Sequence, residues 1–238
     1  DVYKRQVHKY VGARELLRNE DRWCFWLDGM DPDDLSRSRI LRERVEAVRV
    51  FRSKSKAAST REYPHHHLFR QLAKQDEAFV CVPRHVSETR RFFTVARFDE
   101  DVIASDANFT IRDPDGFQFA IMSSSMFITW QKAIGGRLKS DLRFGSTLTW
   151  YTLPLPQVGP DERAAIAEAG QGILEARELH SGRSLAQHYS PLAMDPALVA
   201  AHETLDRLVD RAFGAAQTLR SNDDRATLLF QRYAELTT

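Results

Sequence analysis

The sequence of 238 residues predicts an α+β protein, in which a mixed β-sheet and helix domain is followed by a small all-helical domain. Short apolar runs of β-forming residues occur only in the first part of the chain. After Pro154, Pro156 and Pro160 the sequence has helical periodicity almost throughout. The charge changes at the same place, because residues 1–153 hold 26 Lys and Arg against 21 Asp and Glu, whereas residues 154–238 hold 8 against 12. We therefore expect domains at 1–153 and 154–238.

Runs of aromatic and β-branched residues predict the strands of the first domain. These runs are RWCFWL (22–27), AFVCVP (78–83), RFFTVARF (91–98), NFTI (108–111) and STLTWYTL (146–153). Helices are expected at 35–59, which is rich in Arg, and at 116–136, which is apolar enough to form the centre of the core.

Three helices are predicted in the second domain. The first begins near Pro160, and its apolar face repeats Ile166, Ala169, Ile173 and Leu174. The second has Asp195 as N-cap, Pro196 in the first helical position and Gly214 as its stop. The third covers about 224–236. We expect these apolar faces to pack against one another rather than around a cofactor.

Composition excludes a membrane protein, since no apolar run approaches the ~20 residues of a spanning helix. Cys24 and Cys81 are flanked by bulky apolar residues, which indicates buried thiols in a reducing compartment, so we expect a cytoplasmic protein. The chain opens with DVYKRQ rather than Met. We interpret these residues as a cloning remnant or as the end of a preceding domain.

The segment GGRLKSDLRFG (135–145) places charges at every second position, at Arg137, Lys139, Asp141 and Arg143. In a β-strand this alternation buries the intervening apolar residues and presents three cations and one carboxylate outward. A solvated outer face explains the pattern. A surface that reads DNA also explains it, because Arg or Lys binds guanine and Asp accepts from cytosine N4.

The basic helix predicted at 35–59 suits a polyanion. Its Arg42, Arg49, Arg52 and Lys56, together with Arg137, are candidate contacts to DNA phosphates. The alternative is a charged helix that is only solvated.

Other chemistries find little support in the sequence. The histidines at 65–67 have no partner at metal-site spacing, so we expect no metal site. The serines at 123–125 lack a G-x-S-x-G frame. Neither of the two Gly-rich segments, Gly135-Gly136 and Gly170-x-Gly172, has the spacing of a nucleotide-binding loop. No Lys has an acidic residue two positions before it, which excludes the common PD-(D/E)xK nuclease motif.

Several blocks in fixed order resemble the C-terminal part of the MmeI-like restriction-modification enzymes. They include RELLRNEDRWCFWLDG, CVPRHVSETRRFFTVARFDEDVIASDANFTI, SSSMFITWQKAIGGRLKSDLRFGSTLTWYTLPLP and the tail from AAIAEAGQGILEAR to LDRLVDRAFG. The resemblance runs from about Tyr10 to Gly214. In that family an endonuclease, a helical spacer, an adenine N6-methyltransferase, a target recognition domain and a C-terminal helical domain follow one another. It implies that residues 1–153 are the target recognition domain.

The resemblance also implies which residues contact bases. A few pairs of positions set sequence preference in this family, and three of them fall here on Lys139 with Asp141, Arg84 with Asp106, and Ala107 with Arg143. A cation that donates to guanine beside a carboxylate that accepts from cytosine reads a G·C pair from both strands. The chain has Leu142 where the family commonly has an aromatic residue, and this departure leaves the paired positions unchanged.

We therefore expect a sequence-specific recognition module of a bifunctional adenine-specific DNA methyltransferase and endonuclease, with double-stranded DNA and an upstream methyltransferase domain as partners. The Asn-Pro-Pro-Tyr or Asp-Pro-Pro-Tyr motif that holds a flipped adenine is absent, so we assign no catalytic residue and no cofactor to this chain. S-adenosylmethionine and Mg²⁺ are expected for the upstream domains. The alternative is a stand-alone nucleic-acid-binding or interaction protein, and the sequence upstream would distinguish the two.

Overall fold

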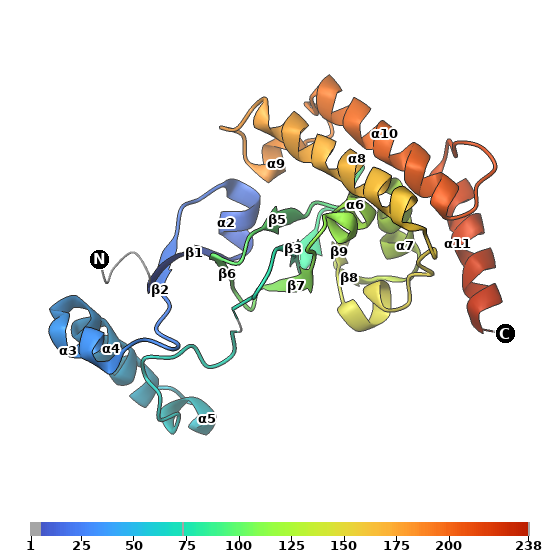
Figure 1. Cartoon of the computed structure of the whole chain (residues 1–238). Coiled ribbons are helices and arrows are strands. Elements are labelled where there is room, and N and C mark those ends of the chain that lie inside the picture. The colour runs from blue at the N-terminus through green and yellow to red at the C-terminus, as the bar shows by residue number, and fades with distance from the viewer. Residues whose placement is uncertain (1–5, 73, 238) are drawn as a thin grey trace.

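The computed structural model describes residues 6–72 and 74–237, and its α+β architecture confirms the predicted fold class. Within these residues, three small sheets cross the middle of the molecule, and helices lie at both ends (Figure 1). The first sheet is formed by β1 (Val7–Val11), β2 (Trp23–Phe25) and β6 (Val102–Ala104); the second by β3 (Phe79–Pro83), β5 (Ala96–Phe98) and β7 (Asn108–Arg112); the third by β4 (His85–Val86), β8 (Gly136–Leu138) and β9 (Asp141–Arg143).

The order of the strands ties the sheets together. In the first sheet β1 is central, antiparallel to β2 and parallel to β6. In the second, β3 is buried along its whole length and lies antiparallel to both β5 and β7. The third sheet has the order β4-β9-β8 and is antiparallel throughout. Only Arg84 separates β3 from β4, so the second and third sheets meet at this residue.

The helices of the basic region are shorter than predicted. The expected helix at 35–59 is divided into α3 (Pro32–Arg37), α4 (Arg39–Ser53) and α5 (Ala58–Arg61), and a separate short helix, α2 (Ala13–Arg18), follows β1. Ser38 leaves the helical conformation and its Oγ accepts from the amide of Leu41 at 3.3 Å, which caps α4. A serine in this position satisfies an amide at the helix start, which favours a break.

The apolar helix predicted at 116–136 is also divided, into α6 (Phe117–Ser123) and α7 (Ser125–Ile134). Ser124 is extended, and its hydroxyl donates to the carbonyl of Ile121 at 2.6 Å. The amide and hydroxyl of Ser125 both donate to the Asp206 carboxylate, at 2.7 and 2.6 Å. The break is therefore stabilised by a residue 81 positions away, which no local pattern reveals.

Two of the predicted strands differ in the structure. Of the run at 91–98, only β5 is a strand, although Phe92, Phe93 and Val95 are fully buried in irregular backbone. The run at 146–153 begins with a π-helix, η1 (Ser146–Trp150), in which the Thr149 hydroxyl donates to the carbonyl of Gly145. Threonines that alternate with apolar residues favour a strand, but their hydroxyls can also bond the preceding helical turn.

The second part of the chain contains the three predicted helices and one short additional helix. They are α8 (Pro160–Glu178), α9 (Leu185–His188), α10 (Pro196–Ala212) and α11 (Asn222–Thr237). Asp195 caps α10 by accepting from the amide of Ala197 at 2.8 Å, and Gly214 follows the helix with φ of 98°. Figure 1 shows α8 and α10 side by side above α6. One hydrophobic cluster includes residues of β3, α6, α7, α8, α10 and α11, so the two predicted domains share a core.

The contact between α6 and α8 depends on a small residue. A Cβ added to Gly170 of α8 would lie 2.7 Å from Cβ of Ala120 and 3.1 Å from its Cα. Gly172, two residues further on in the same helix, has no atom within 4 Å of an added Cβ. The two glycines therefore serve as a matched pair.

We predict that Gly170→Ala destabilises the protein by about 1–3 kcal/mol, because the packed helices must move apart. Gly172→Ala is the control and should be neutral or stabilising by up to about 1 kcal/mol, since alanine favours a helix more than glycine does. Urea unfolding of both variants measures the difference. Equal effects of the two substitutions would contradict close packing at Gly170.

A buried histidine of α10, His202, contacts residues of the first part of the chain. The His202 ring is fully buried and stacks on Phe92 with the ring centroids 3.8 Å apart. Its Nε2 lies 2.9 Å from the Tyr189 hydroxyl and its Nδ1 lies 3.1 Å from the carbonyl oxygen of Ser123. Burial, and then the nearby charge of Arg177, hold the pKa of His202 well below its ordinary value.

We predict that acid weakens the protein through His202. The unfolded histidine binds a proton near pH 6.5 and the folded one only at lower pH, so its contribution is complete above pH 6.5 and is lost as the pH falls. The free energy of unfolding should decrease by up to about 1.4 kcal/mol per pH unit below 6.5 from this group. Urea unfolding of His202→Gln at pH 7.5 and 5.5 should show a smaller decrease than in the wild type. Exposed His65→Gln is the control, and a His202→Gln decrease equal to that of wild type would contradict the assignment.

Candidate nucleic-acid interface

Asp106 and Ala107 lie at the tip of the turn that joins β6 to β7. The Asn108 amide donates to the carbonyl of Ser105 at 3.0 Å, and the Ala107 amide donates to the Ser105 hydroxyl at 3.2 Å. The Asn108 side chain donates to the carbonyl of Val11 at 3.0 Å, which fixes the turn to the end of β1. The carboxylate of Asp106 is exposed on this fixed turn.

Arg84 lies against the same turn. Its Nε and one terminal nitrogen donate to the backbone carbonyl of Asp106, at 3.1 and 2.7 Å, and its guanidinium lies 5.2 Å from the ring centroid of Phe109. The carbonyl of Arg84 accepts from the amide of Phe144 at 2.9 Å. The structure thus brings Arg84 and Asp106 together across 22 positions, through a guanidinium–carbonyl contact. No ion pair of their side chains is present among the described residues.

The segment at 135–145 is a β-hairpin, so the prediction of one continuous strand is wrong. Leu138 pairs with Asp141, which leaves a two-residue turn of Lys139 and Ser140, and Lys139 has φ of 56°. A non-glycine residue adopts this conformation mainly in turns, and a periodicity of two cannot reveal it. Lys139 therefore occupies the tip of the hairpin rather than a place in a row.

Asp141 and Arg143 point away from the core on one face of β9, because Leu142 between them is fully buried. Within the residues that the structure describes, the side chains of Lys139, Asp141 and Arg143 have neither a hydrogen bond nor an ion pair. Arg137, by contrast, shares a face with Leu142 and donates to the carbonyl of the turn residue Ser140 at 3.1 Å. The hairpin thus presents a lysine, an aspartate and an arginine whose charges are uncommitted.

One group of aromatic residues supports both the turn and the hairpin. Phe109 of β7 and Phe144, which follows β9, meet edge to face with the ring centroids 5.1 Å apart. Gln131 of α7 donates to the carbonyl of Arg143 at 3.1 Å. Gly135 leaves space for this contact, since a Cβ added to it would lie 1.9 Å from the side-chain nitrogen Nε2 of Gln131. No hydrogen bond joins Ala107 to Arg143 in the described parts of the chain.

The predicted phosphate contacts on the basic region are mostly occupied by local interactions. Arg42 donates to carbonyls in the last turn of α3, and Arg49 forms a 2.6 Å ion pair with a glutamate of α4. Arg52 donates to two carbonyls of the segment that follows α5, at 3.1 and 2.7 Å. Only Lys56 of the four has no side-chain partner among the described residues. Arg137 also lies 3.5 Å from a glutamate, and all five assignments stay predictions.

The sequence reading missed His85. It pairs with Arg143 across β4 and β9, so the two side chains lie on one face of the third sheet. Its position directly after Arg84 was the available signal. The half-buried imidazole adds a group that can donate or accept beside the uncommitted charges.

Other predicted features can be placed in the structure. The described residues contain no group of His, Cys, Asp or Glu that could hold a metal ion, and no helix among them could span a membrane. Cys81 is fully buried as expected, but Cys24 is only half-buried. Burial raises the pKa of the Cys24 thiol to about 11 and raises that of Cys81 as well, so both stay protonated at neutral pH.

The fold and the charged turns define the class of the protein when they are compared with known families. The family model for the MmeI target recognition domain matches residues 1–157, and that for the MmeI C-terminal domain matches residues 158–238. The chain therefore belongs to the MmeI family. The two models meet a few residues after the boundary that the prolines suggested.

Two relatives show how the chain relates to longer proteins. It is 31% identical over 230 residues to DNA methyltransferase A of Bacillus subtilis (strain 168), a match that covers 96% of this chain and 26% of that protein. It also resembles a solved structure of the type IIL restriction-modification enzyme MmeI in complex with DNA, with a TM-score of 0.88 and 32% sequence identity. That likeness covers 99% of this chain and 32% of the other. The chain thus spans about a third or less of these relatives.

Proposed function

We propose that this chain is the DNA-recognition module of a restriction-modification enzyme and that it reads base pairs in the major groove of duplex DNA. The observation that carries the proposal is the agreement in fold, over nearly the whole chain, with an enzyme whose structure was solved in complex with DNA. The exposed, uncommitted charges on two fixed turns supply the chemistry. Fixed turns favour recognition because little side-chain and loop ordering is needed on binding.

In this proposal each turn reads bases with a cation beside a carboxylate. Two donors of Arg84 hold the carbonyl of Asp106, which orients the remaining donors of its guanidinium toward guanine O6 and N7. The exposed carboxylate of Asp106 accepts from cytosine N4 of the same pair. Lys139 and Asp141 have the same division of roles on the hairpin. Ala107 and Arg143 form the third pair, in which the alanine methyl group can contact a thymine methyl.

We further propose that the chain acts with an upstream methyltransferase domain in an intact enzyme, which methylates adenine and cleaves DNA. The supporting observation is that the relatives of the chain are much longer than the chain itself. S-adenosylmethionine and Mg²⁺ belong to those upstream domains in this proposal. No residue of this chain is assigned to either, since the sequence lacks the Asn-Pro-Pro-Tyr or Asp-Pro-Pro-Tyr motif and its described residues hold no group of three or more side chains that could bind a metal ion.

The proposed function is tested by selection of bound duplexes from a randomised pool with the purified chain, followed by sequencing. We predict weak binding with steep salt dependence, enrichment of a sequence that contains two G·C pairs, and no methyl transfer from S-adenosylmethionine. Methyl transfer by the chain alone would contradict the assignment of catalysis to upstream domains. Binding without any enrichment would favour a stand-alone nucleic-acid-binding protein.

Arg84→Ala is the sharpest single substitution. It should abolish preference at one base pair, a loss of about 1–3 kcal/mol of discrimination, and leave preference elsewhere unchanged. Arg112→Ala is the matched control, because Arg112 is an exposed arginine at the opposite end of β7 whose partners are surface carboxylates. Binding to a panel of duplexes that differ at single positions measures both effects. A uniform loss of affinity over all sequences would make Arg84 a phosphate contact, and a lower thermal stability with unchanged preference would make it structural.

The hairpin pair is tested in the intact enzyme. Lys139→Glu combined with Asp141→Arg should invert one preferred pair from G·C to C·G, because the donor and the acceptor change places across the groove. Sequencing of methylated sites measures the result. If the variant stays active and its recognition sequence is unchanged, both residues are solvated surface charges that read no base.

A further inference from the structure

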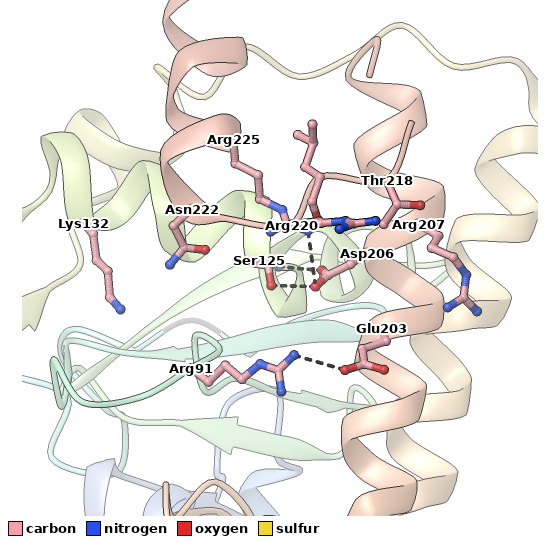
Figure 2. Close-up of a pocket in the computed structure, with 11 residues that line it drawn as sticks. Arg91, Ser125, Lys132, Glu203, Asp206, Arg207, Thr218, Arg220, Asn222 and Arg225 are labelled. Atoms are coloured by element: carbon pink, nitrogen blue, oxygen red, sulfur yellow. Dashed lines mark hydrogen bonds and ion pairs between the residues drawn. The ribbon is translucent and has the colours of Figure 1, made fainter. Parts of the chain in front are cut away.

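A polar cleft lies between the two parts of the chain, and none of its lining residues belongs to the two proposed base-reading turns. It has a volume of about 510 Å³ and is lined by Arg91, Ser125 and Lys132 of the first part and by residues of α10, α11 and the connection between them. Figure 2 shows Lys132 and Asn222 on the left of this space, Arg91 below it, and Asp206 and Arg220 further to the right. Both parts of the chain are therefore needed to form it.

The cleft contains more positive than negative charge. Arg91 pairs with Glu203 at 3.3 Å, and Arg225 at the floor is held by Asp210 through two bonds of 2.9 and 2.8 Å. In each of these pairs the carboxylate neutralises the charge of the arginine.

Three further cations line the cleft, namely Lys132, Arg207 and Arg220, and none of them has a carboxylate partner in the described chain. The other lining carboxylate, Asp206, is buried and accepts two bonds from Ser125. Arg220 is exposed, and its side chain forms no hydrogen bond with a described residue. The cleft thus holds uncommitted positive charge above a neutralised floor.

Lys132 connects the cleft to the hairpin. Its ammonium group lies 3.4 Å from the carbonyl oxygen of Arg90, a neutral partner. Burial, and then the nearby guanidinium of Arg137 on β8, lower the pKa of Lys132. An anion in the cleft would relieve this repulsion, because an opposite charge favours the protonated amine. Glu88, which lies 3.5 Å from Arg137, acts on Lys132 in the opposite direction, and Lys132 thus lies between the cleft and β8.

We propose that this cleft binds the phosphate backbone of DNA beside the base pairs that the hairpin reads. Lys132 at one end of the cleft and Arg220 at the other each contact phosphate oxygens, so that the C-terminal helices extend the footprint without adding sequence preference. The inference rests on the proposed function and adds a site that neither base-reading turn includes. The same chemistry suits a free phosphate or a nucleotide, which the experiment separates from the DNA backbone.

The test measures how duplex affinity depends on salt, by fluorescence anisotropy of the full chain between about 50 and 200 mM KCl. A plot of log affinity against log salt concentration has a negative slope, and removal of one phosphate contact reduces its magnitude by about 0.9. We expect Arg220→Ala and Lys132→Gln each to lower the slope by up to about this amount, with unchanged preference among duplex sequences. Arg220→Lys should keep most of the slope, because it keeps the charge.

Arg183→Ala is the matched control, since Arg183 is an exposed arginine that lines a different hollow near α9. It should leave the slope unchanged. If wild type binds duplex DNA with a preferred sequence and Arg220→Ala and Lys132→Gln have the wild-type slope, the cleft does not contact the backbone and only this inference fails. If wild type binds no duplex, the proposed function fails and the inference fails with it.

A titration with inorganic phosphate, followed by NMR shifts of amides near Asn222, examines the other source. Millimolar phosphate that binds in the cleft and competes with duplex DNA supports the shared site. Phosphate binding that leaves duplex affinity and its salt slope unaffected would assign the cleft to a free anion and overturn the proposal.

Discussion

The structure depends on two side chains one turn apart on α10, His202 and Asp206. They bond to the polar groups that lack a helical partner where Ser124 separates α6 from α7. The carbonyl of Ser123 contacts the imidazole of His202, and the amide and hydroxyl of Ser125 donate to the carboxylate of Asp206. A buried backbone group without such a partner costs about 1–3 kcal/mol. The C-terminal helices therefore provide the bonds that let the central helix bend.

The bend determines where the β8–β9 hairpin lies. The direction of α7 places Gln131 against the carbonyl of Arg143, and the hairpin begins directly after α7 at Gly136. The hairpin in turn meets the β6–β7 turn through Phe144, which packs on Phe109 and bonds the carbonyl of Arg84. A chain of direct contacts thus runs from α10 to the residues proposed to contact DNA, although none of the helical residues in it carries base-reading chemistry.

The sequence predicted elements well where the signal was local. Periodicity and caps identified α8, α10 and α11, including Asp195 as N-cap, and β-propensity identified β2, β3 and β7. It failed where a distant partner decided the outcome, as at Ser125, or where one residue adopted an unusual backbone conformation, as at Lys139. β1, α2, β6 and α9 are short elements stabilised by pairing or packing with other segments, and their own sequences carried too weak a pattern. The family resemblance placed Arg84 and Asp106 among the candidates, but the carbonyl contact between them needed coordinates.

The shared core has a consequence for how such proteins diversify. Family models divide the chain between residues 157 and 158, yet the close contact of Gly170 in α8 with Ala120 in α6 crosses this boundary. A protein interior loses stability when the surfaces packed in it do not fit each other closely. Recombination between homologous genes at the boundary would join α6 of one parent to α8 of another and would bring together surfaces selected separately. We therefore expect the region from β1 to α11 to be inherited most readily as one cassette, with changes of specificity arising by substitution on the turns proposed to contact DNA.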